Sequence, residues 1–294
     1  MRETIIDRAL AARLLPPRRA DGHKGSFGRL LVLGGSVGYT GAPYLAACAA
    51  EHSGCGLVEL GVPESIWAVE AAKCEGAMPF PLPEKDGRLC LAALDAVQER
   101  LSRCDVLALG PGLGRGKETE QLVHALLRQA EEPLVLDADG LNALQGCAEK
   151  LDVRRGRVTI LTPHDGEFAR LSGRSLAEIA SEERSELACG FAQRHACVLV
   201  LKGHRTLIAL PDGRLLRNTS GSSALAKGGS GDVLTGLIAS LLCQGAQAAE
   251  AAALGVWLHG RAGELLEQEL TAYCVTPGAL ARRGIPAAFG ELAR

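Results

Sequence analysis

Short aliphatic segments recur along this chain, and glycine, aspartate, proline or lysine follows each of them before the next predicted element begins. Apolar runs of strand length, without polar alternation, are typical of parallel strands that helices cover on both faces. Strands that alternate with helices therefore favour a parallel α/β sheet. The strands that we expect are Leu30–Leu33 as the first, then Leu57–Leu60, Val106–Leu109, Leu134–Leu136, Val158–Leu161 and Val198–Leu201.

The intervening segments predict helices and one hairpin. Pro211-Asp212-Gly213 is a typical turn between strands at Thr206–Leu210 and Arg214–Arg217. Pro43 suits the first turn of a helix that reaches Ser53. We expect Asp139 to cap a helix over Gly140–Leu144. Further helices are expected over Glu118–Gln129, up to Leu171, over Asp232–Leu242 and over about Ala246–Glu269, with breaks at Pro277, Gly284 and Pro286.

Composition limits the class of protein. The 294 residues are 47% hydrophobic, enough for a large core, and no linker or shift in composition divides them, so we expect a single domain over residues 1–294. A net charge of −2 argues against a broad nucleic-acid surface. No apolar run is long enough for a membrane span, and the first residues lack a signal-peptide pattern. Several of the ten cysteines lie in apolar runs without a C-x-x-C pair. We expect a cytoplasmic, soluble protein.

The strongest local signal is Gly228-Gly229-Ser230-Gly231-Asp232, a glycine-rich turn that leads into a predicted helix. Backbone N–H groups at a helix start suit a phosphate, and an acid beside it is placed to accept a proton. The alternative is a tight turn in which Asp232 only stabilises the helix start. In either case the helix dipole and N–H donors are expected to keep the pKa of Asp232 low.

Three other segments carry polar groups after predicted strands. The loop Gly34–Gly41 is rich in glycine but lacks the G-x-G-x-x-G spacing of dinucleotide-binding folds. His164 follows Thr162-Pro163, where it either binds substrate or is structural, and Glu167 fits the first turn of the next helix. Lys202–Thr206 gathers basic groups that suit a polyphosphate or simply a solvated loop. Asp137 and Asp139 form a pair of acids, of which Asp139 is explained by helix capping and Asp137 has no assigned function.

Together and in this order, these segments resemble the ADP/ATP-dependent NAD(P)H-hydrate dehydratases, a branch of the ribokinase-like superfamily. The resemblance extends from about Gly25 to Glu267. TPHDGE combined with DADGLN is its most specific part, whereas many ribokinase-like kinases share the final glycine–aspartate motif. The matching segments are Gly28–Ala42, Gly110–Gly114, Leu136–Leu144, Leu161–Leu171, Lys202–Thr206 and Gly228–Gly236.

The resemblance implies a ribokinase-like three-layer α/β/α fold with a mainly parallel central sheet. It also implies nucleotide-dependent dehydration of the S form of hydrated NADH or NADPH, with ADP or ATP as co-substrate, Mg²⁺ as cofactor and Asp232 as the catalytic base. A homo-oligomer, tetrameric in family members, is implied as well. No side chain is assigned to a metal. The implied substrate contacts are Ala42, Gly112, His164 and Asp232, and the implied nucleotide contacts are Lys202, Gly203, His204, Arg205, Thr206 and Gly231.

The chain departs from the family pattern before the glycines, where members often carry Asn-Pro-Gly-Met-Ala-Thr and this chain has Ser220-Gly221 and then Ala224–Lys227. Many bacterial members also carry an N-terminal epimerase domain, and we expect a separate protein to supply that step. Two alternatives stay open: a ribokinase-like kinase of a vitamin precursor, and a nucleotide-binding protein without turnover. TPHDGE and DADGLN weigh against the kinase, and an intact Asp232 weighs against lost activity.

Overall fold

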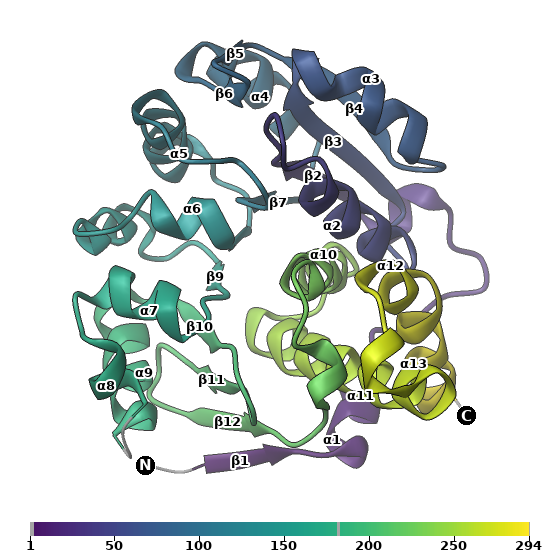
Figure 1. Ribbon diagram of the computed structural model, residues 1–294. Coiled ribbons are helices and arrows are strands. Elements are labelled where there is room, and N and C mark those ends of the chain that lie inside the picture. Colours follow the sequence, from purple (N-terminus) through teal and green to yellow (C-terminus); the bar gives the residue numbers. More distant parts are fainter. Residues whose placement is uncertain (1–2, 181–182, 294) are drawn as a thin grey trace.

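The computed structural model describes residues 3–180 and 183–293. Its strands form one ten-stranded sheet in the order β1-β12-β11-β10-β9-β8-β7-β2-β3-β4 (Figure 1). Neighbouring strands are parallel, except that β11 is antiparallel to both β10 and β12. The strands are β1 Glu3–Ile6, β2 Arg29–Leu33, β3 Leu57–Pro63, β4 Met78–Leu82, β7 Val106–Leu109, β8 Leu134–Leu136, β9 Thr159–Leu161, β10 Val198–Leu201, β11 Leu207–Ala209 and β12 Leu215–Asn218, with a separate hairpin of β5 Glu84–Lys85 and β6 Arg88–Leu89.

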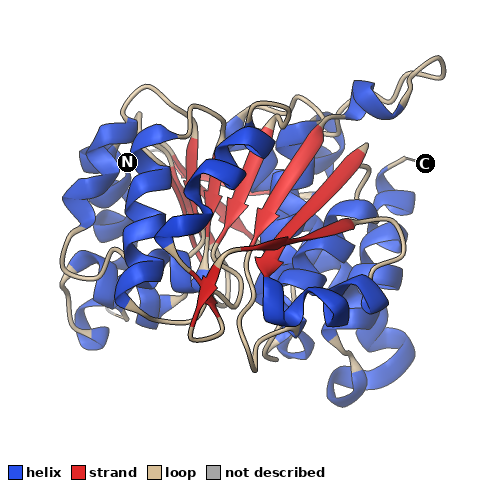
Figure 2. Cartoon of the chain, turned by 90° about the horizontal axis from the view of Figure 1, so that it is seen from above, coloured by secondary structure: helices blue, strands red, loops and turns tan. Residues whose placement is uncertain are grey.

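Helices cover both faces of this sheet (Figure 2), so the predicted three-layer fold with a mainly parallel sheet is confirmed. No helix in the two described ranges is long and apolar enough to cross a membrane. The α-helices are α1 Arg8–Arg13, α2 Gly41–Glu51, α3 Glu64–Lys73, α4 Leu94–Leu101, α5 Lys117–Gln129, α6 Ala138–Asn142, α7 Asp165–Ser172, α8 Leu176–Ile179, α9 Arg184–His195, α10 Ser230–Cys243, α11 Ala248–Cys274, α12 Pro277–Ala279 and α13 Ile285–Leu292. Shorter turns are η1 Lys24–Phe27, η2 Leu91–Ala93, η3 Ala148–Arg154, η4 Ser223–Leu225 and the π-helical η5 Leu280–Gly284.

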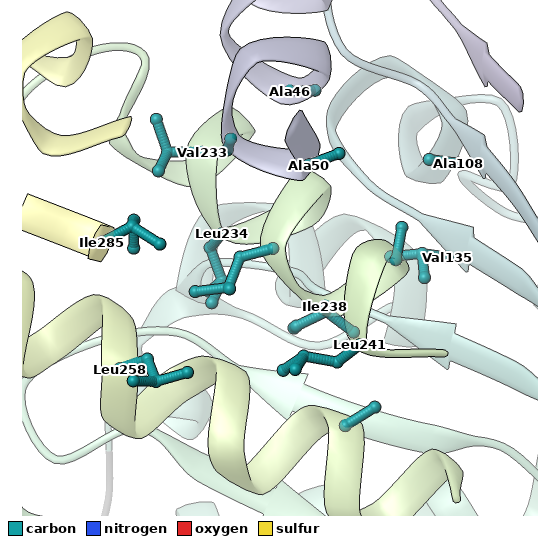
Figure 3. Close-up of a cluster of buried hydrophobic side chains, with 14 of the residues drawn as sticks. Ala46, Ala50, Ala108, Val135, Val233, Leu234, Ile238, Leu241, Leu258 and Ile285 are labelled. Carbon is teal, nitrogen blue, oxygen red and sulfur yellow. The ribbon is translucent and has the colours of Figure 1, made fainter. Parts of the chain in front are cut away.

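The two faces of the central strands carry different side chains. Leucine dominates the face that packs against α4 to α9, as at Leu107 and Leu109 of β7. Smaller side chains such as Val106 and Ala108 face α2, α10 and α11. Figure 3 shows this second cluster, in which Ala46 and Ala50 of α2 lie close to α10. Small residues on this face let the helices approach the sheet and one another closely.

The contact between α2 and α10 is close enough to exclude a side chain. A Cβ atom at Gly236 of α10 would lie 1.9 Å from the carbonyl oxygen of Ala46 in α2. No residue other than glycine fits there without moving one helix. Because Gly236 lies in the second turn of α10 and Ala46 in the second turn of α2, this contact sets the spacing between the two helix starts.

Three local predictions are wrong. The first strand is Glu3–Ile6, which pairs with β12, rather than Leu30–Leu33. Asp139 does not cap a helix, because α6 begins at Ala138 and the Asp139 carboxylate accepts a hydrogen bond from the Gly114 N–H at 2.9 Å instead. The expected breaks at Gly284 and Pro286 are absent, because α12, η5 and α13 follow one another without interruption, whereas the break at Pro277 is confirmed, since α11 ends at Cys274 and α12 begins at Pro277.

Candidate active site

The motif loops meet at one edge of the sheet. Gly112, Asp137, His164 and Lys202 lie in the loops that follow β7, β8, β9 and β10, which are adjacent and parallel. The loop after β2 leads into α2, whose second residue is Ala42. The carboxyl edge of a parallel sheet is where open α/β folds bind ligands. The sequence segments predicted to bind ligands are therefore brought to one side of the molecule.

Asp232 lies in the first turn of α10, which begins at Ser230 after Gly229. Gly229 has a φ of 101°, a conformation that favours glycine at this turn. The Ser230 carbonyl accepts a hydrogen bond from Nε2 of His259 on α11 at 2.8 Å. Burial lowers the pKa of His259 to about 4, so a neutral imidazole holds the start of α10 in place.

A buried ion pair lies beside this helix start. The Lys202 ammonium is 2.9 Å from Oδ1 of Asp137 and 3.8 Å from Oε2 of Glu167. The hydroxyl of Thr235, on α10, donates a hydrogen bond to Oδ2 of Asp137 at 2.7 Å. A Cβ atom at Gly231 would lie 3.2 Å from the Lys202 ammonium, so this cation also touches the glycine turn. Strands β8, β9 and β10 and helix α10 thus share one electrostatic network.

The predicted low pKa of Asp232 is wrong. Burial raises the pKa of this carboxyl to about 7, and the negative charge of Asp137 raises it further than the positive charge of Lys202 lowers it. For Lys202, burial acts to lower the pKa, but Asp137 and Glu167 raise it above its ordinary value. Lys202 is therefore a cation at neutral pH, while Asp232 titrates around neutral pH.

His164 is the N-cap of α7. Its Nδ1 accepts hydrogen bonds from the N–H groups of Gly166 at 3.0 Å and Glu167 at 3.3 Å, while the Glu167 carboxylate accepts one from the His164 N–H. The prediction that Glu167 lies in the first turn of this helix is confirmed. With Nδ1 an acceptor, Nε2 carries the proton of the neutral ring, and 56% of the side chain is exposed. His164 is therefore structural and is also open to a ligand.

The Lys202–Thr206 loop folds back on itself. Thr206 is buried, and its hydroxyl donates a hydrogen bond to the Gly203 carbonyl at 3.0 Å, whereas His204 and Arg205 are exposed. Arg184 at the start of α9 holds the loop from outside. Its guanidinium donates to the Lys202 carbonyl at 2.9 Å and to the Asp165 carboxylate at 2.6 Å. One side chain thus joins the loop after β9 to the loop after β10.

Ala42 and Gly112 lie against each other. A Cβ atom at Gly112 would be 3.1 Å from Cβ of Ala42 and 2.8 Å from the Tyr39 carbonyl oxygen. One turn further along α2, Leu45 would meet a Cβ atom at Gly229 at 2.8 Å. Helix α2 therefore touches both the Gly112 loop, at Ala42, and the glycine turn before Asp232, at Leu45.

Four residues of this network had no predicted function: Asp137, Thr235, His259 and Arg184. Asp137 carried a signal, because it is an acid directly after an aliphatic strand, as Lys202 is a base directly after another. Thr235 lies in the matching segment Gly228–Gly236 but had no function assigned there, and nothing local in the sequence marks His259 or Arg184. Only the packing of those helices against the loops reveals them.

The fold places the chain in a known structural class. The ribokinase of Thermotoga maritima superposes with a TM-score of 0.55 at 16% identity, over 90% of this chain and 99% of that one. The ADP/ATP-dependent NAD(P)H-hydrate dehydratase of Bacillus subtilis, co-crystallised with ATP and Mg²⁺, superposes with a TM-score of 0.81 at 31% identity, over 98% of each chain. The fold is ribokinase-like.

Sequence relatives narrow this class. The model of the NAD(P)H-hydrate dehydratase family matches residues 30–284, so the chain belongs to that family. It is 49% identical over 85% of its length to the bifunctional NAD(P)H-hydrate repair enzyme of Moorella thermoacetica, and covers 47% of that protein. It is 38% identical to the ADP-dependent (S)-NAD(P)H-hydrate dehydratase of Neisseria meningitidis, over 92% of this chain and 87% of that one. The chain thus spans about half the length of the bifunctional relatives.

Proposed function

We propose that this chain dehydrates the S form of hydrated NADH and NADPH, with ADP as phosphoryl donor and AMP and phosphate as products. The observation that carries the proposal is Asp232, a carboxylate of pKa about 7 in the first turn of α10 beside the buried Lys202. A general base works best when its pKa is near the working pH. Family membership and the names of the relatives supply the substrate class.

The reaction needs a better leaving group than hydroxide. Asp232 accepts the proton of the hydrate's hydroxyl as that oxygen attacks the terminal phosphorus of the donor, and AMP departs. The phosphorylated oxygen then leaves as phosphate, driven by the ring nitrogen's electron pair. Loss of a ring proton restores the dihydronicotinamide. The N–H groups at the start of α10 and the Lys202 ammonium stabilise the negative charge on the transferred phosphoryl group.

Mg²⁺ is proposed to arrive with the nucleotide. In the described ranges no three His, Cys, Asp or Glu side chains are placed to hold a metal ion. Both Asp137 oxygens are already bonded, to Lys202 and Thr235. Mg²⁺ usually binds one or two carboxylates together with substrate phosphates, so a site completed by the nucleotide fits this arrangement. The ion would offset the polyphosphate charge.

Ligand assignments follow the same reasoning. We propose that Ala42, Gly112, His164 and Asp232 contact the hydrate. Because Gly231 borders the Lys202 ammonium, we propose that the Lys202–Thr206 loop holds the donor phosphates or ribose. ADP is preferred as donor because the relatives of similar length are named ADP-dependent, with ATP as the second candidate. We also propose that the chain acts as a single domain, in a homo-oligomer, in the cytoplasm.

The test is recovery of NADH absorbance from hydrated NADH with ADP or ATP. We expect NADH to appear with a nucleotide and not without one, whereas a kinase of another metabolite would release none. Asp232→Asn should lower kcat by about 10²- to 10⁴-fold, the usual contribution of a general base. Asp95→Asn, in the exposed first turn of α4, is the matched control and should leave kcat unchanged. A near-normal kcat in Asp232→Asn would remove Asp232 from the mechanism.

A further inference from the structure

A hollow of about 380 Å³ lies between α5, α6 and η3, and the proposed function makes no use of it. Arg115, at the end of the loop after β7, and Lys150 of η3 supply its two permanent positive charges. Glu120 is the one carboxylate among its lining residues and is exposed to solvent. The wall is completed by His124, Asn142 and Cys147. The hollow is therefore suited to an anion.

Both cations keep donors for a ligand. The Lys150 ammonium is 3.1 Å from Nδ1 of His124, whose Nε2 lies 2.8 Å from the Ala143 carbonyl oxygen. A carbonyl only accepts, so Nε2 carries the proton and Nδ1 accepts from Lys150, which retains two further N–H donors. The nearest ion-pair partner of Arg115 in the described chain is Asp139, at 3.9 Å. Among the described residues, Lys150 takes part in no ion pair and Arg115 only in this long one.

The hollow adjoins the candidate active site through Asp139. The Asp139 carboxylate accepts hydrogen bonds from the Asn142 amide at 3.0 Å and from the Gly114 N–H at 2.9 Å. Its charge also acts on Asp232, whose pKa it helps to raise, so it is close to both regions. Arg115 follows Gly112 by three residues, which places their Cα atoms within about 11 Å of each other. A ligand seated at Gly112 that extends past Gly114 reaches this hollow.

We propose that the hollow binds the ribose 2′-phosphate of hydrated NADPH. The proposal rests on the proposed function, in which the hydrated ring of the dinucleotide lies at Ala42, Gly112 and Asp232. The adenosine half of a dinucleotide extends well beyond that ring. A phosphate monoester carries a charge of roughly −1.5 to −2 at neutral pH, which matches two permanent cations. Hydrated NADH has a hydroxyl at this position, so Arg115 and Lys150 would favour the phosphorylated substrate.

The test compares the two hydrates in wild type, Arg115→Gln and Lys150→Met. Loss of a charge-assisted contact should raise KM for hydrated NADPH about tenfold or more, and leave KM for hydrated NADH and for ADP unchanged. Arg128→Gln, which removes an exposed cation of α5 outside the hollow, is the matched control. Because Arg115 is exposed, its replacement tests the proposal even where Lys150→Met weakens the fold.

The outcomes separate this inference from the proposed function. Unchanged KM values in an active enzyme overturn the phosphate site alone. An equal rise in KM for both hydrates would indicate that the hollow binds the diphosphate, which both share, and would overturn the assignment to the 2′-phosphate. Titration of the protein with intact NADPH and NADH gives a readout that needs no turnover: Arg115→Gln should weaken NADPH binding only. That result supports the site even if the wild type fails to dehydrate either hydrate.

Discussion

The ammonium group of Lys202 lies 2.9 Å from the carboxylate of Asp137, and both side chains are largely removed from solvent. Breaking such a pair on one side leaves an uncompensated buried charge. Here the consequence extends beyond the pair, because Lys202 also lowers the pKa of Asp232 while Asp137 raises it. The protonation of the proposed base therefore depends on a pair of residues from two other loops.

The first prediction concerns the pH profile. Asp232 must be ionised to accept a proton, so kcat/KM for the hydrate should increase as pH rises through the pKa of about 7. Lys202→Met removes a charge that lowers this pKa, so the rising limb should move to higher pH. Lys202→Arg keeps the charge and should leave the limb nearly in place. If kcat/KM rose at the same pH in both variants, the charge of Lys202 would not control the pKa of Asp232.

The second prediction concerns stability. The pKa of Asp232 is raised from 3.8 in the unfolded chain to about 7 in the folded one. The folded state therefore binds the proton more tightly, and wild type loses stability as pH rises from about 4 to 7, with the full loss above 7. Asp232→Asn escapes this cost, on the order of a few kcal/mol at pH 8. Its melting temperature should exceed that of wild type at pH 8, and the gap should close towards pH 4.

Asp95→Asn serves as the control for that stability measurement, because its carboxylate is exposed in the first turn of α4. It should produce no gap that grows with pH. A gap of constant size across the pH range in Asp232→Asn would show that the amide acts through packing rather than through ionisation.

The third prediction separates the two functions of His164. Asparagine is a good N-cap, so His164→Asn should keep the start of α7 intact, whereas His164→Ala should cost about 1 kcal/mol of unfolding free energy. If the exposed imidazole binds the hydrate, both variants raise KM for the hydrate and leave KM for ADP unchanged. Steady-state kinetics with thermal melting give both readouts. A normal KM in His164→Asn would restrict His164 to capping.

The fourth prediction concerns Arg184 as a positioning residue. Its guanidinium fixes the Lys202 carbonyl from outside, so Arg184→Met should loosen the Lys202–Thr206 loop and raise KM for ADP roughly tenfold, the loss of one charged hydrogen bond. KM for the hydrate should change little. Asp165→Asn removes only the other partner of Arg184 and should have a smaller effect on KM for ADP. Equal increases in both KM values would indicate general loosening instead.

Much of the sheet could be predicted from the sequence, and the strands that could not share a property. The inner strands are aliphatic runs because both of their faces are buried. The two unpredicted strands of the main sheet, β1 and β4, are its edges. Three of the four residues of β1 are exposed, and β4 contains Pro79 and Pro81, which only an edge strand accommodates. An edge lacks the pattern that marks a buried strand.

The site divides in a similar way. The loops after the strands could be predicted to converge, since each ends a parallel strand. The pairing of Asp137 with Lys202 could not, because it depends on β8 and β10 flanking β9, and spacing along the chain does not determine that order. The direction of the pKa shift of Asp232 was predicted wrongly for the same reason. A helix start is visible in a sequence, but its burial and its charged neighbours are not.

The contact of Gly236 with the Ala46 carbonyl has a consequence for how this scaffold can diversify. Two backbones in direct contact have no side chain between them whose size could be exchanged. The separation of the helix starts at Ala42 and Asp232 is therefore not adjustable by substitution at that contact. In this chain, substitutions in the loops after β7 to β10 can change the substrate contacts while the spacing of these two helices stays constant.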